Sequence, residues 1–479
     1  MAEAQEASQG FRPAQFAGSW YPGDRRELEK FVDELLAAAK APELPGPPVA
    51  VIAPHAGYRY SAAVAAAGYR SLQGRECRRV VALAFSHHRA GTYRGVDVPR
   101  HLPAYETPLG PVPVDREVCE ALLKKKGFVT NPNVDRGEHS LELQLPFLQR
   151  TLREFRLVPL HVGRMSDEDY VQAAEGLLPF LDDRTVVVVS SDGTHFGPDY
   201  GYEPFRDDIP NRLRELADRA AAPLLNADYD GFAAHLEQTG DTICGRGPIL
   251  LLMRILSMQG GAEGVRAAFD TSGRQTGDTR NSVTYQSFVF ARRVAKLDQA
   301  ARKALLKLAR EAIQARLTGR PLPKADPAQL PESARIKGAC FVTLMNHGEL
   351  RGCIGTMTAA GPLAEAVIDN AVSACADFRF AGQPVTAAEM EQIDLEISFL
   401  GPLRRVSRIE EIVVGRHGLL ISRGGHRGVL LPQVAYERGW RRTEFLAQTC
   451  RKAGLPSDAW TQPDTNIELF EAEVFGERD

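Results

Sequence analysis

Apolar residues in the first part of the chain gather in short runs that are bounded by polar turns. Four such runs are VAVIAP (49–54), VVALAF (80–85), LVPLHV (157–162) and VVVVSS (186–191). Between and around them, apolar residues recur at helical spacing in segments 24–41, 61–72, 115–125, 140–152 and 167–181. Continuous apolar strands that alternate with amphipathic helices predict an α/β fold around a mostly parallel central sheet.

The pattern changes near residue 295. Segment 282–294 alternates like a strand that closes a domain, and segment 297–319 has the alanine and leucine spacing of a helix that ends at Gly319. A proline-rich connector follows. Beyond it, the sequence predicts strands at 340–345, 395–403 and 418–423 and helices near 361–375 and 443–453. We therefore expect an α/β domain at 1–295 and an α+β domain with an antiparallel or mixed sheet at 296–479.

The composition narrows the class of protein. A chain of 479 residues, 44% of them hydrophobic, is long enough for two or three cores. Its net charge of −3 indicates no general affinity for nucleic acid or for an anionic membrane. Seven scattered cysteines fit a reducing compartment better than a disulfide framework. With no signal-like N-terminus and no run of about 18 apolar residues, we expect a cytoplasmic protein without a membrane partner.

Histidines lie near the ends of all four apolar runs. His55 comes after the first, His87 and His88 after the second, His161 follows LVPL within the third, and His195 follows the fourth. Because ligands bind beyond the carboxyl ends of parallel strands, we expect these side chains to meet at one edge of the sheet. Among these histidines, His161 is the weakest candidate for the site, because its sequence neighbours are apolar.

Imidazoles at one edge of a sheet indicate a metal site. Two histidines with one anionic ligand suit iron, zinc or copper. The sequence leaves four anionic candidates open: Asp192, Glu138, Glu142 and Cys244. Cys244 precedes an apolar helical segment, where a helix dipole stabilises a thiolate. The contexts of His101 and His235 predict surface positions.

Six ordered motifs in this part resemble a known family. They are FAGSWYPGD, IAPHAGYRYS, SHHR, EHSLELQLPF, SSDGTHFG and TICGRGP. Together they are similar to the Memo family, protein B of the AmmeMemoRadiSam group, over about residues 11–293. The resemblance implies a class III extradiol dioxygenase-like fold, in which two histidines and a carboxylate hold non-haem Fe(II).

The resemblance also implies roles for individual residues. By motif, His55, His87 and Cys244 are the expected metal ligands, with the cysteine standing where the dioxygenases have a carboxylate. His195 matches an acid/base histidine that does not bind the metal. Two further residues, Asp192 and His139, are expected to complete the catalytic pocket. The sequence leaves open whether His88 takes the place of His87.

The second domain carries weaker chemical signals. In GELRGCIGTM, Arg351 and Cys353 lie in a glycine-rich segment, where the thiol is either reactive or simply packed. Residues 402–452 contain eleven Lys/Arg and four Asp/Glu, an excess of positive charge that is consistent with an anionic partner such as RNA. Aromatic residues that could stack on the bases of a nucleic acid are sparse in this segment. SRGGHRG fits a hairpin turn as well as a phosphate loop.

The order of LRGCIGT, DFRF, LEISFL, GRHGLLI and GVLLPQVA is similar to the AMMECR1 family, protein A of the same group, over about 298–479. The fusion of the two families resembles the AmmeMemoRadiSam arrangement, which implies a separate radical-SAM enzyme as partner. This chain has no CxxxCxxC motif for the iron–sulfur cluster of such an enzyme.

Three functions are consistent with these features. The first is an iron-type redox or oxygenase protein that uses Fe(II), or copper or zinc in its place, and acts on an aromatic small molecule, a peptide or a modified macromolecule. The second is a metal-binding scaffold or peptide-recognition module without catalysis. The third is a hydrolase with zinc at the same ligands.

Overall fold

The computed structural model describes residues 10–478 except 132, 260, 293–295, 381 and 407. The chain divides into two compact units, Met1–Arg293 and Val294–Asp479. The expected boundary after residue 295 falls at residues outside the described part. Among the described helices, none is both long and apolar enough to cross a membrane. All seven cysteines lie in described segments, and all are free thiols.

Four parallel strands form the centre of the N-terminal sheet. In spatial order they are β2 (Pro48–Ala53), β9 (Thr185–Ser190), β3 (Arg79–Ala84) and β8 (Arg156–Val162). They coincide with the four apolar runs, whose almost complete burial explains why the runs lack polar alternation.

The outer strands change the character of this sheet. On one side, β12 (Ser282–Ala291) runs antiparallel to β2 and pairs with β11 (Glu263–Thr271) and β10 (His195–Phe196). On the other side, β4 (Val96–Asp97) is antiparallel to β8 and parallel to β7 (Phe128–Val129). The prediction of a mostly parallel sheet is therefore wrong in its extent: the sheet is mixed, with a parallel centre.

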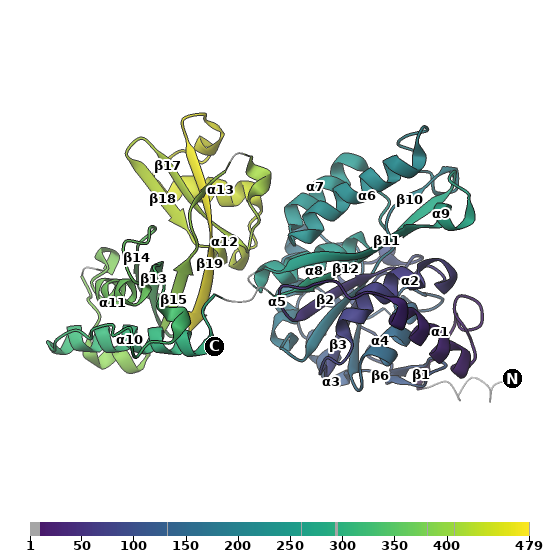
Figure 1. Ribbon diagram of the computed structural model, residues 1–479, viewed down its shortest axis with the longest axis horizontal. Helices are drawn as coiled ribbons and strands as arrows, with labels where there is room; N and C mark the ends of the chain where they lie inside the picture. Colours follow the sequence, from purple (N-terminus) through teal and green to yellow (C-terminus); the bar gives the residue numbers. More distant parts are fainter. Residues whose placement is uncertain are drawn as a thin grey trace. The chain divides into compact units, whose positions relative to one another are not determined.

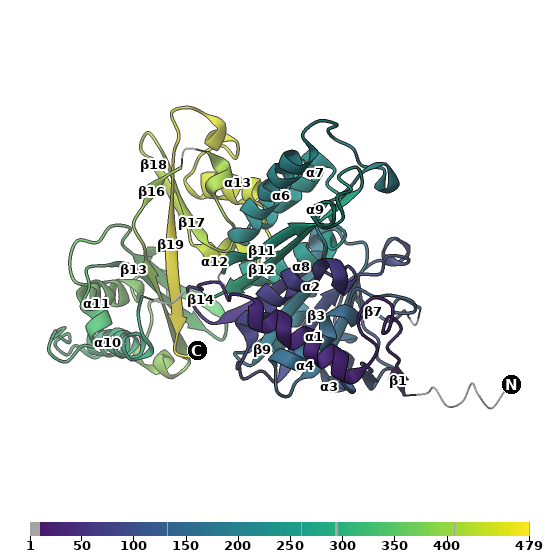
Figure 2. The ribbon, with the colours of Figure 1, turned by 45° about the vertical axis from the view of Figure 1, so that its right-hand side comes forward.

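Helices cover this sheet in two layers (Figure 1). One layer packs on β2 and consists of α1 (Arg25–Ala38), α2 (Tyr58–Tyr69) and α4 (Leu145–Thr151), which also lie together in Figure 2. On the other side, α8 (Arg246–Met258) packs on β9, β3 and β8, and α5 (Asp167–Leu177) and α7 (Tyr229–Thr239) pack against α8. The remaining elements are α3 (Arg116–Leu122), α6 (Ile209–Leu225), α9 (Ser272–Thr276) and a small sheet of β1 (Phe11–Arg12), β5 (Ala104–Tyr105) and β6 (Val112–Pro113).

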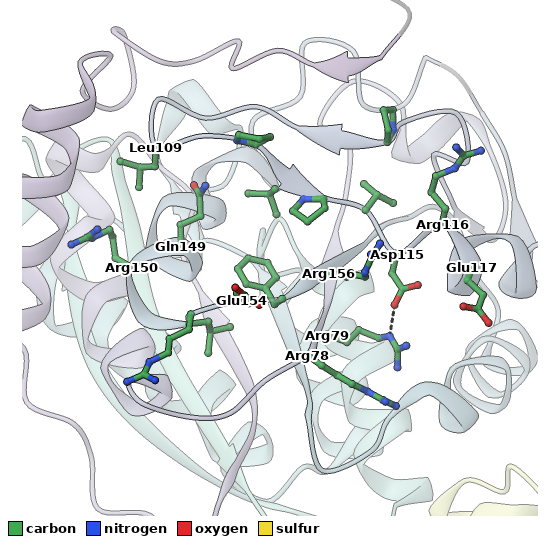
Figure 3. A pocket seen from close by; sticks show the side chains of 18 of the residues that line it. Arg78, Arg79, Leu109, Asp115, Arg116, Glu117, Gln149, Arg150, Glu154 and Arg156 are labelled. Carbon is green, nitrogen blue, oxygen red and sulfur yellow. Dashed lines mark hydrogen bonds and ion pairs between the residues drawn. The ribbon is translucent and has the colours of Figure 1, made fainter.

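A wide cavity of about 1090 Å³ lies at the edge of the sheet where β3 and β8 begin (Figure 3). Arg79 and Arg156, at the starts of these strands, contribute to its lining, and Arg79 forms an ion pair of 2.9 Å with Asp115. This is the edge opposite to the histidines, so the cavity takes no part in the predicted metal site.

The C-terminal unit is α+β with an antiparallel sheet. Its strands are β14 (Glu349–Gly355), β13 (Ala339–Asn346), β15 (Ile393–Leu400), β19 (Asn466–Gly476), β17 (His417–Arg423) and β18 (His426–Leu430), with β16 (Arg404–Arg405) beside β19. Two helices, α10 (Gln299–Thr318) and α11 (Leu363–Ala374), share a core with β13 and β15. Two others, α12 (Pro432–Glu437) and α13 (Arg442–Lys452), share one with β17 and β19. SRGGHRG is the hairpin between β17 and β18, with Gly424 at φ +58°.

Candidate metal centre

The loop after β2 holds His55 in a fixed position. The Asp192 carboxylate, just beyond β9, accepts hydrogen bonds from the backbone N–H groups of His55 (2.7 Å) and Ala56 (3.2 Å). β2 and β9 are parallel neighbours, so their ends are adjacent and a side chain from one reaches the loop of the other. Helix α2 begins at Tyr58 and prevents the loop from continuing as strand.

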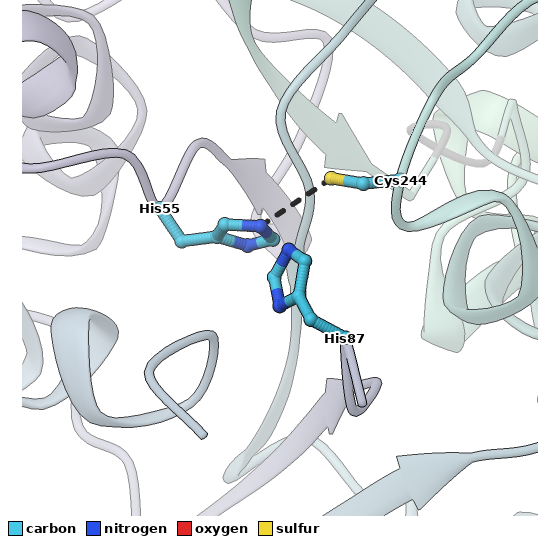
Figure 4. Close-up of side chains that lie close together, drawn as sticks. All are labelled: His55, His87 and Cys244. Atoms are coloured by element: carbon cyan, nitrogen blue, oxygen red, sulfur yellow. Dashed lines mark hydrogen bonds between the residues drawn. The ribbon is translucent and has the colours of Figure 1, made fainter. Parts of the chain in front are cut away.

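Three predicted ligands meet beyond this edge. His55, His87 and Cys244 each offer one ligand atom, and these atoms lie within 4.8 Å of one another (Figure 4). The Cys244 Sγ is 3.3 Å from His55 Nε2. Around a tetrahedral ion with bonds of about 2.0–2.3 Å, ligand atoms are roughly 3.3–3.8 Å apart, so small side-chain movements suffice for binding.

Hydrogen bonds fix the tautomer of His55. Its Nδ1 lies 2.8 Å from Ser190 Oγ. The Ser190 hydroxyl has a single proton and donates it to the carbonyl oxygen of Ser140, while its oxygen accepts from Gln144 Nε2 at 2.7 Å. Nδ1 of His55 therefore carries the proton and donates to Ser190. The lone pair of Nε2 is left facing Cys244, as metal ligation requires.

Glu138 orients His87 in the same way. This fully buried carboxylate accepts from the His87 backbone N–H at 2.6 Å, from His87 Nδ1 at 2.9 Å and from the Ser140 N–H at 2.8 Å. Burial alone raises the pKa of Glu138, but the hydrogen bond and charge of His87 outweigh burial and leave that pKa below its ordinary value. An ionised Glu138 holds the proton on Nδ1 and leaves Nε2 of His87 available to an ion.

A glycine lets the Cys244 loop approach the end of β9. Gly245 stands where a Cβ atom would lie 2.4 Å from the Cβ of Ser191 and 2.7 Å from the carbonyl oxygen of Ser190. Its N–H donates to Ser191 Oγ at 3.0 Å, and the Asp192 N–H donates to Cys244 Sγ at 3.2 Å. A larger residue than glycine would push the cysteine away from the histidines.

Burial shifts the pKa values of His55 and Cys244 in opposite directions, and both groups are neutral near pH 7. Burial lowers the pKa of His55 well below its ordinary value, and the charges of His87 and His195 lower it further, so His55 is neutral near pH 7. Burial raises the pKa of the Cys244 thiol well above its ordinary value, and the Asp192 carboxylate adds to this shift. Cys244 directly precedes the N-cap of α8, but the direction of its pKa shift is opposite to the one that a helix dipole would cause. A metal ion has to displace the thiol proton.

The other three predicted pocket residues surround this group. His195 lies in β10, where its Nδ1 donates to the carbonyl oxygen of Gly193 at 3.1 Å and leaves Nε2 free to accept a proton. Asp192 is buried, which raises its pKa, and its carboxylate binds backbone rather than a histidine ring. His139 stacks on His87, with ring centroids 4.4 Å apart.

A second group of possible ligands shares one member with the first. His87, Glu138 and His139 also offer atoms within 4.8 Å of one another. The hydrogen bonds from His87 to Glu138 explain this proximity without an ion. The centroid of the His139 ring also lies 4.2 Å from that of Trp20, a residue of the N-terminal segment.

Several sequence-based expectations need correction. His88 is exposed and lies outside both groups of possible ligands in the described part of the chain. His161 is not beyond a strand but inside β8, fully buried, with Nε2 3.4 Å from Asp135. His235 is not at the surface: it is 8% exposed and its Nε2 lies 2.9 Å from Asp241. His101 is exposed, as expected.

Glu142, one of the open anionic candidates, has another role. Its fully buried carboxylate accepts from the backbone N–H of Phe16 at 2.8 Å and from the hydroxyl of Tyr21 at 2.8 Å, and it pairs with Arg12. These contacts pin the N-terminal segment and with it Trp20. Glu142 therefore supports the wall of the site and does not belong to the ligand group.

The candidates in the C-terminal unit have local partners. Cys353 Sγ accepts from Thr343 Oγ1 at 3.2 Å, and burial raises its pKa. Arg351 is 3.3 Å from Glu389. In the basic segment, Arg416 and Arg423 form ion pairs of 3.0 and 2.8 Å with residues outside it, which reduces the charge available to an anionic partner.

Sequence reasoning missed the residues that orient the ligands. Ser190 and Gln144 set the tautomer of His55, and Trp20 covers His139, yet none was predicted for the site. Ser190 was visible only as the polar end of an apolar run. Gln144 and Trp20 belong to motifs that carried the family resemblance, EHSLELQLPF and FAGSWYPGD, but nothing in their local pattern indicated a role.

Comparisons with known proteins find relatives that match a part of this chain. A protein of Methanothermobacter thermautotrophicus is 43% identical over 183 residues, which cover 36% of this chain and 93% of that protein. A Methanopyrus kandleri protein is 42% identical over 186 residues, which cover 36% of this chain and 87% of that protein. The crystal structure of an uncharacterized protein from Pyrococcus horikoshii is 39% identical, covers 38% of this chain and 94% of its own, and has a TM-score of 0.36.

Two protein families match the chain in succession. The family described as Memo-like protein matches residues 12–289, more than half of the chain, and this match contains the whole candidate metal centre. The family AMMECR1 matches residues 306–475. The chain therefore belongs to the Memo-like family and carries an AMMECR1 domain after its Memo-like domain.

Proposed function

We propose that the Memo-like domain binds one transition-metal ion through His55, His87 and Cys244 and acts as an iron-type redox or oxygenase protein. The proposal is supported by one observation: a potential ligand atom of each residue lies within 4.8 Å of the others, and separate hydrogen bonds at Nδ1 leave Nε2 of both imidazoles available to an ion. The relationship of the family to extradiol dioxygenases supports iron.

The ligand set is chemically suited to this role. Two neutral imidazoles and a thiolate bind Fe(II), copper or zinc, and when bound, iron or copper supplies electron transfer or activation of O₂ at an open position. Thiolate donates more charge than the carboxylate of the dioxygenases, which favours softer or more oxidised metals. The reaction therefore need not be ring cleavage, and copper and zinc stay as alternatives to Fe(II).

The chain supplies proton transfer beside the ion. His195 accepts a proton at Nε2, because its Nδ1–H is held by the carbonyl oxygen of Gly193. Asp192 keeps the His55 loop in place through two backbone hydrogen bonds. His139 and Trp20 cover one side of the ion site. In this proposal the substrate is an aromatic small molecule or a peptide.

Partnership with a radical-SAM enzyme is a further part of the proposal. It is supported by the joining of a Memo-like and an AMMECR1 domain in one chain, the arrangement of the AmmeMemoRadiSam group. If the metal site serves only as a scaffold or peptide-recognition module, the chain will bind metal and this partner without turning over a substrate.

Anaerobic reconstitution with Fe(II) tests the proposal. We expect about one iron per chain in the unaltered protein and little in a His55→Ala variant, because the variant loses a ligand whose tautomer is fixed. A His101→Ala variant, altered at an exposed histidine, is the matched control and should bind iron normally. Equal iron in the His55→Ala variant and the unaltered protein would contradict the proposal. Zinc retained in place of iron after purification without added metal would favour the hydrolase alternative.

A further inference from the structure

A second cavity of the Memo-like domain has no role in metal binding. It has a volume of about 660 Å³ and lies between the N-terminal segment, α1 and the start of α2. We call it the aromatic pocket, because five aromatic residues line it: Trp20, Tyr21, Phe31, Tyr58 and Tyr60. Its size lies within the range of about 300–1,000 Å³ that is typical of small-molecule sites.

The walls of the aromatic pocket are held in place from the protein interior. The Tyr58 hydroxyl donates to the carbonyl oxygen of Leu143 at 2.7 Å, and the Tyr21 hydroxyl donates to Glu142 at 2.8 Å. The backbone N–H of Tyr58 donates to the carbonyl oxygen of Trp20 at 2.8 Å, which joins the N-terminal segment to α2. Tyr21 and Tyr58 are almost fully buried and form the rigid base of the pocket, while the more exposed rings of Trp20 and Tyr60 supply surface for a ligand.

One cation stands at the rim of this apolar surface. Arg59 is exposed, and its guanidinium carbon lies 5.7 Å from the centre of the Tyr60 ring. Within the part of the chain that the structure describes, Arg59 has no carboxylate partner, and the residues lining the aromatic pocket include no Asp or Glu. The charge of Arg59 is therefore available to an anionic group of a ligand.

The aromatic pocket shares a wall with the candidate metal centre. The Trp20 ring lines the pocket and also lies 4.2 Å from the ring of His139, which stacks on the ligand His87 at 4.4 Å. At 37% exposure, the indole offers a free face to a ligand. A molecule that contacts Trp20 in the pocket is therefore connected to the ligand His87 through the ring of His139.

We propose that the aromatic pocket binds an aromatic carboxylate, with the ring against Trp20 and Tyr60 and the carboxylate on Arg59. Apolar walls without an acidic residue favour a ring, and the single unpaired guanidinium selects for a negative charge beside it. This ligand class goes beyond metal binding, because the pocket contains none of the metal ligands.

Calorimetric titration of the full chain with 3-phenylpropionate tests the proposal. We expect binding of one molecule, weakened about fivefold in Arg59→Gln because an exposed ion pair is lost. Trp20→Ala should weaken binding about tenfold, since the ring loses its apolar partner. Arg26→Gln, altered at an exposed arginine outside the pocket lining, is the matched control and should bind normally.

Two related probes separate the contributions of ring and charge. 3-Phenylpropanol, which lacks the carboxylate, and hexanoate, which lacks the ring, should both bind more weakly than 3-phenylpropionate. Equal binding of 3-phenylpropionate to the unaltered and Arg59→Gln chains, or equal binding of hexanoate, would overturn the proposal. The titration is made without metal, so its outcome is independent of whether the chain binds iron.

Discussion

Removing the negative charge of Glu138 should weaken metal binding although no ligand is altered. In Glu138→Gln, an amide replaces a carboxylate that accepts three hydrogen bonds, two from His87 and one from Ser140. The amide N–H₂ must face one of these donors, and the ring of His87 loses the partner that keeps the proton on Nδ1. Loss of such a support costs about 10- to 100-fold in metal affinity, or about 1.4–2.7 kcal/mol.

Competition titration with a chelator, with Zn²⁺ as an air-stable probe, measures this effect. Circular dichroism checks folding, because the altered buried group costs about 1–3 kcal/mol of stability. Glu142→Gln is the matched control: Glu142 is as fully buried as Glu138 but binds the N-terminal segment instead of His87. We expect its metal affinity to change by no more than about twofold. An unchanged affinity in folded Glu138→Gln, or equal losses in both variants, would refute the reasoning.

Three further predictions follow from the geometry of the site. Gly245→Ala places a methyl group 2.4 Å from the Ser191 Cβ, so it should lower the free energy of unfolding by about 1–3 kcal/mol and the metal affinity by at least about tenfold. Thermal unfolding and chelator competition measure these effects, with Gly91→Ala as the control because a Cβ there meets nothing within 4 Å; equal effects in both variants would contradict the close-approach argument. Because burial raises the pKa of Cys244, a bound ion must displace one thiol proton, and the metal affinity should rise about tenfold per pH unit between pH 6 and pH 8. A metal affinity that does not change with pH would exclude a thiolate ligand. Burial lowers the pKa of His139 to about 3, so below about pH 6.5 the unfolded chain takes up a proton that the folded chain does not, and the folded state loses stability. In urea unfolding, the free energy of unfolding of the unaltered chain should therefore fall by about 2 kcal/mol more than that of His139→Phe between pH 7 and pH 5, and an equal fall in both chains would show that His139 protonates freely in the folded state.

The centre of the fold was accessible from sequence because it depends on local pattern. A strand that is buried on both faces has a continuous run of apolar residues, and all four central strands show such a run in the sequence. Their parallel arrangement brought the ends of β2, β3 and β9 together, which is why His55 and His87 could be placed at one edge before any coordinates were known. The two-domain, mixed α/β architecture is confirmed.

The outer part of the sheet was not accessible in this way. The sequence predicted the strand that is β12, within 282–294, but not its partner β11. The two strands are separated in sequence by α9, and their pairing is set by tertiary packing that no local periodicity reports. The prediction for His161 failed for a related reason. A histidine at the end of an apolar run reads as a strand-end residue, whereas here β8 continues through it and Asp135 offers a buried partner.

The fine structure of the site also depends on long-range contacts. Ser190 and Ser140 are fifty residues apart, and only their hydrogen bond settles which nitrogen of His55 carries the proton. Glu138 was an anionic candidate by residue type, but its part in orienting His87 required coordinates. Sequence therefore predicted that His55, His87 and Cys244 lie together at this edge of the sheet, whereas the tautomers and the supporting hydrogen bonds depend on the fold.

X-ray absorption spectroscopy at the metal edge, on the anaerobically reconstituted chain, tests the central claim most directly. A site made of His55, His87 and Cys244 predicts one sulfur ligand at about 2.3 Å and two imidazole nitrogens at about 2.0–2.1 Å. The sulfur contribution should vanish in Cys244→Ser. An ion bound only by nitrogen and oxygen in the unaltered chain, or a sulfur ligand that persists in Cys244→Ser, would contradict the claim.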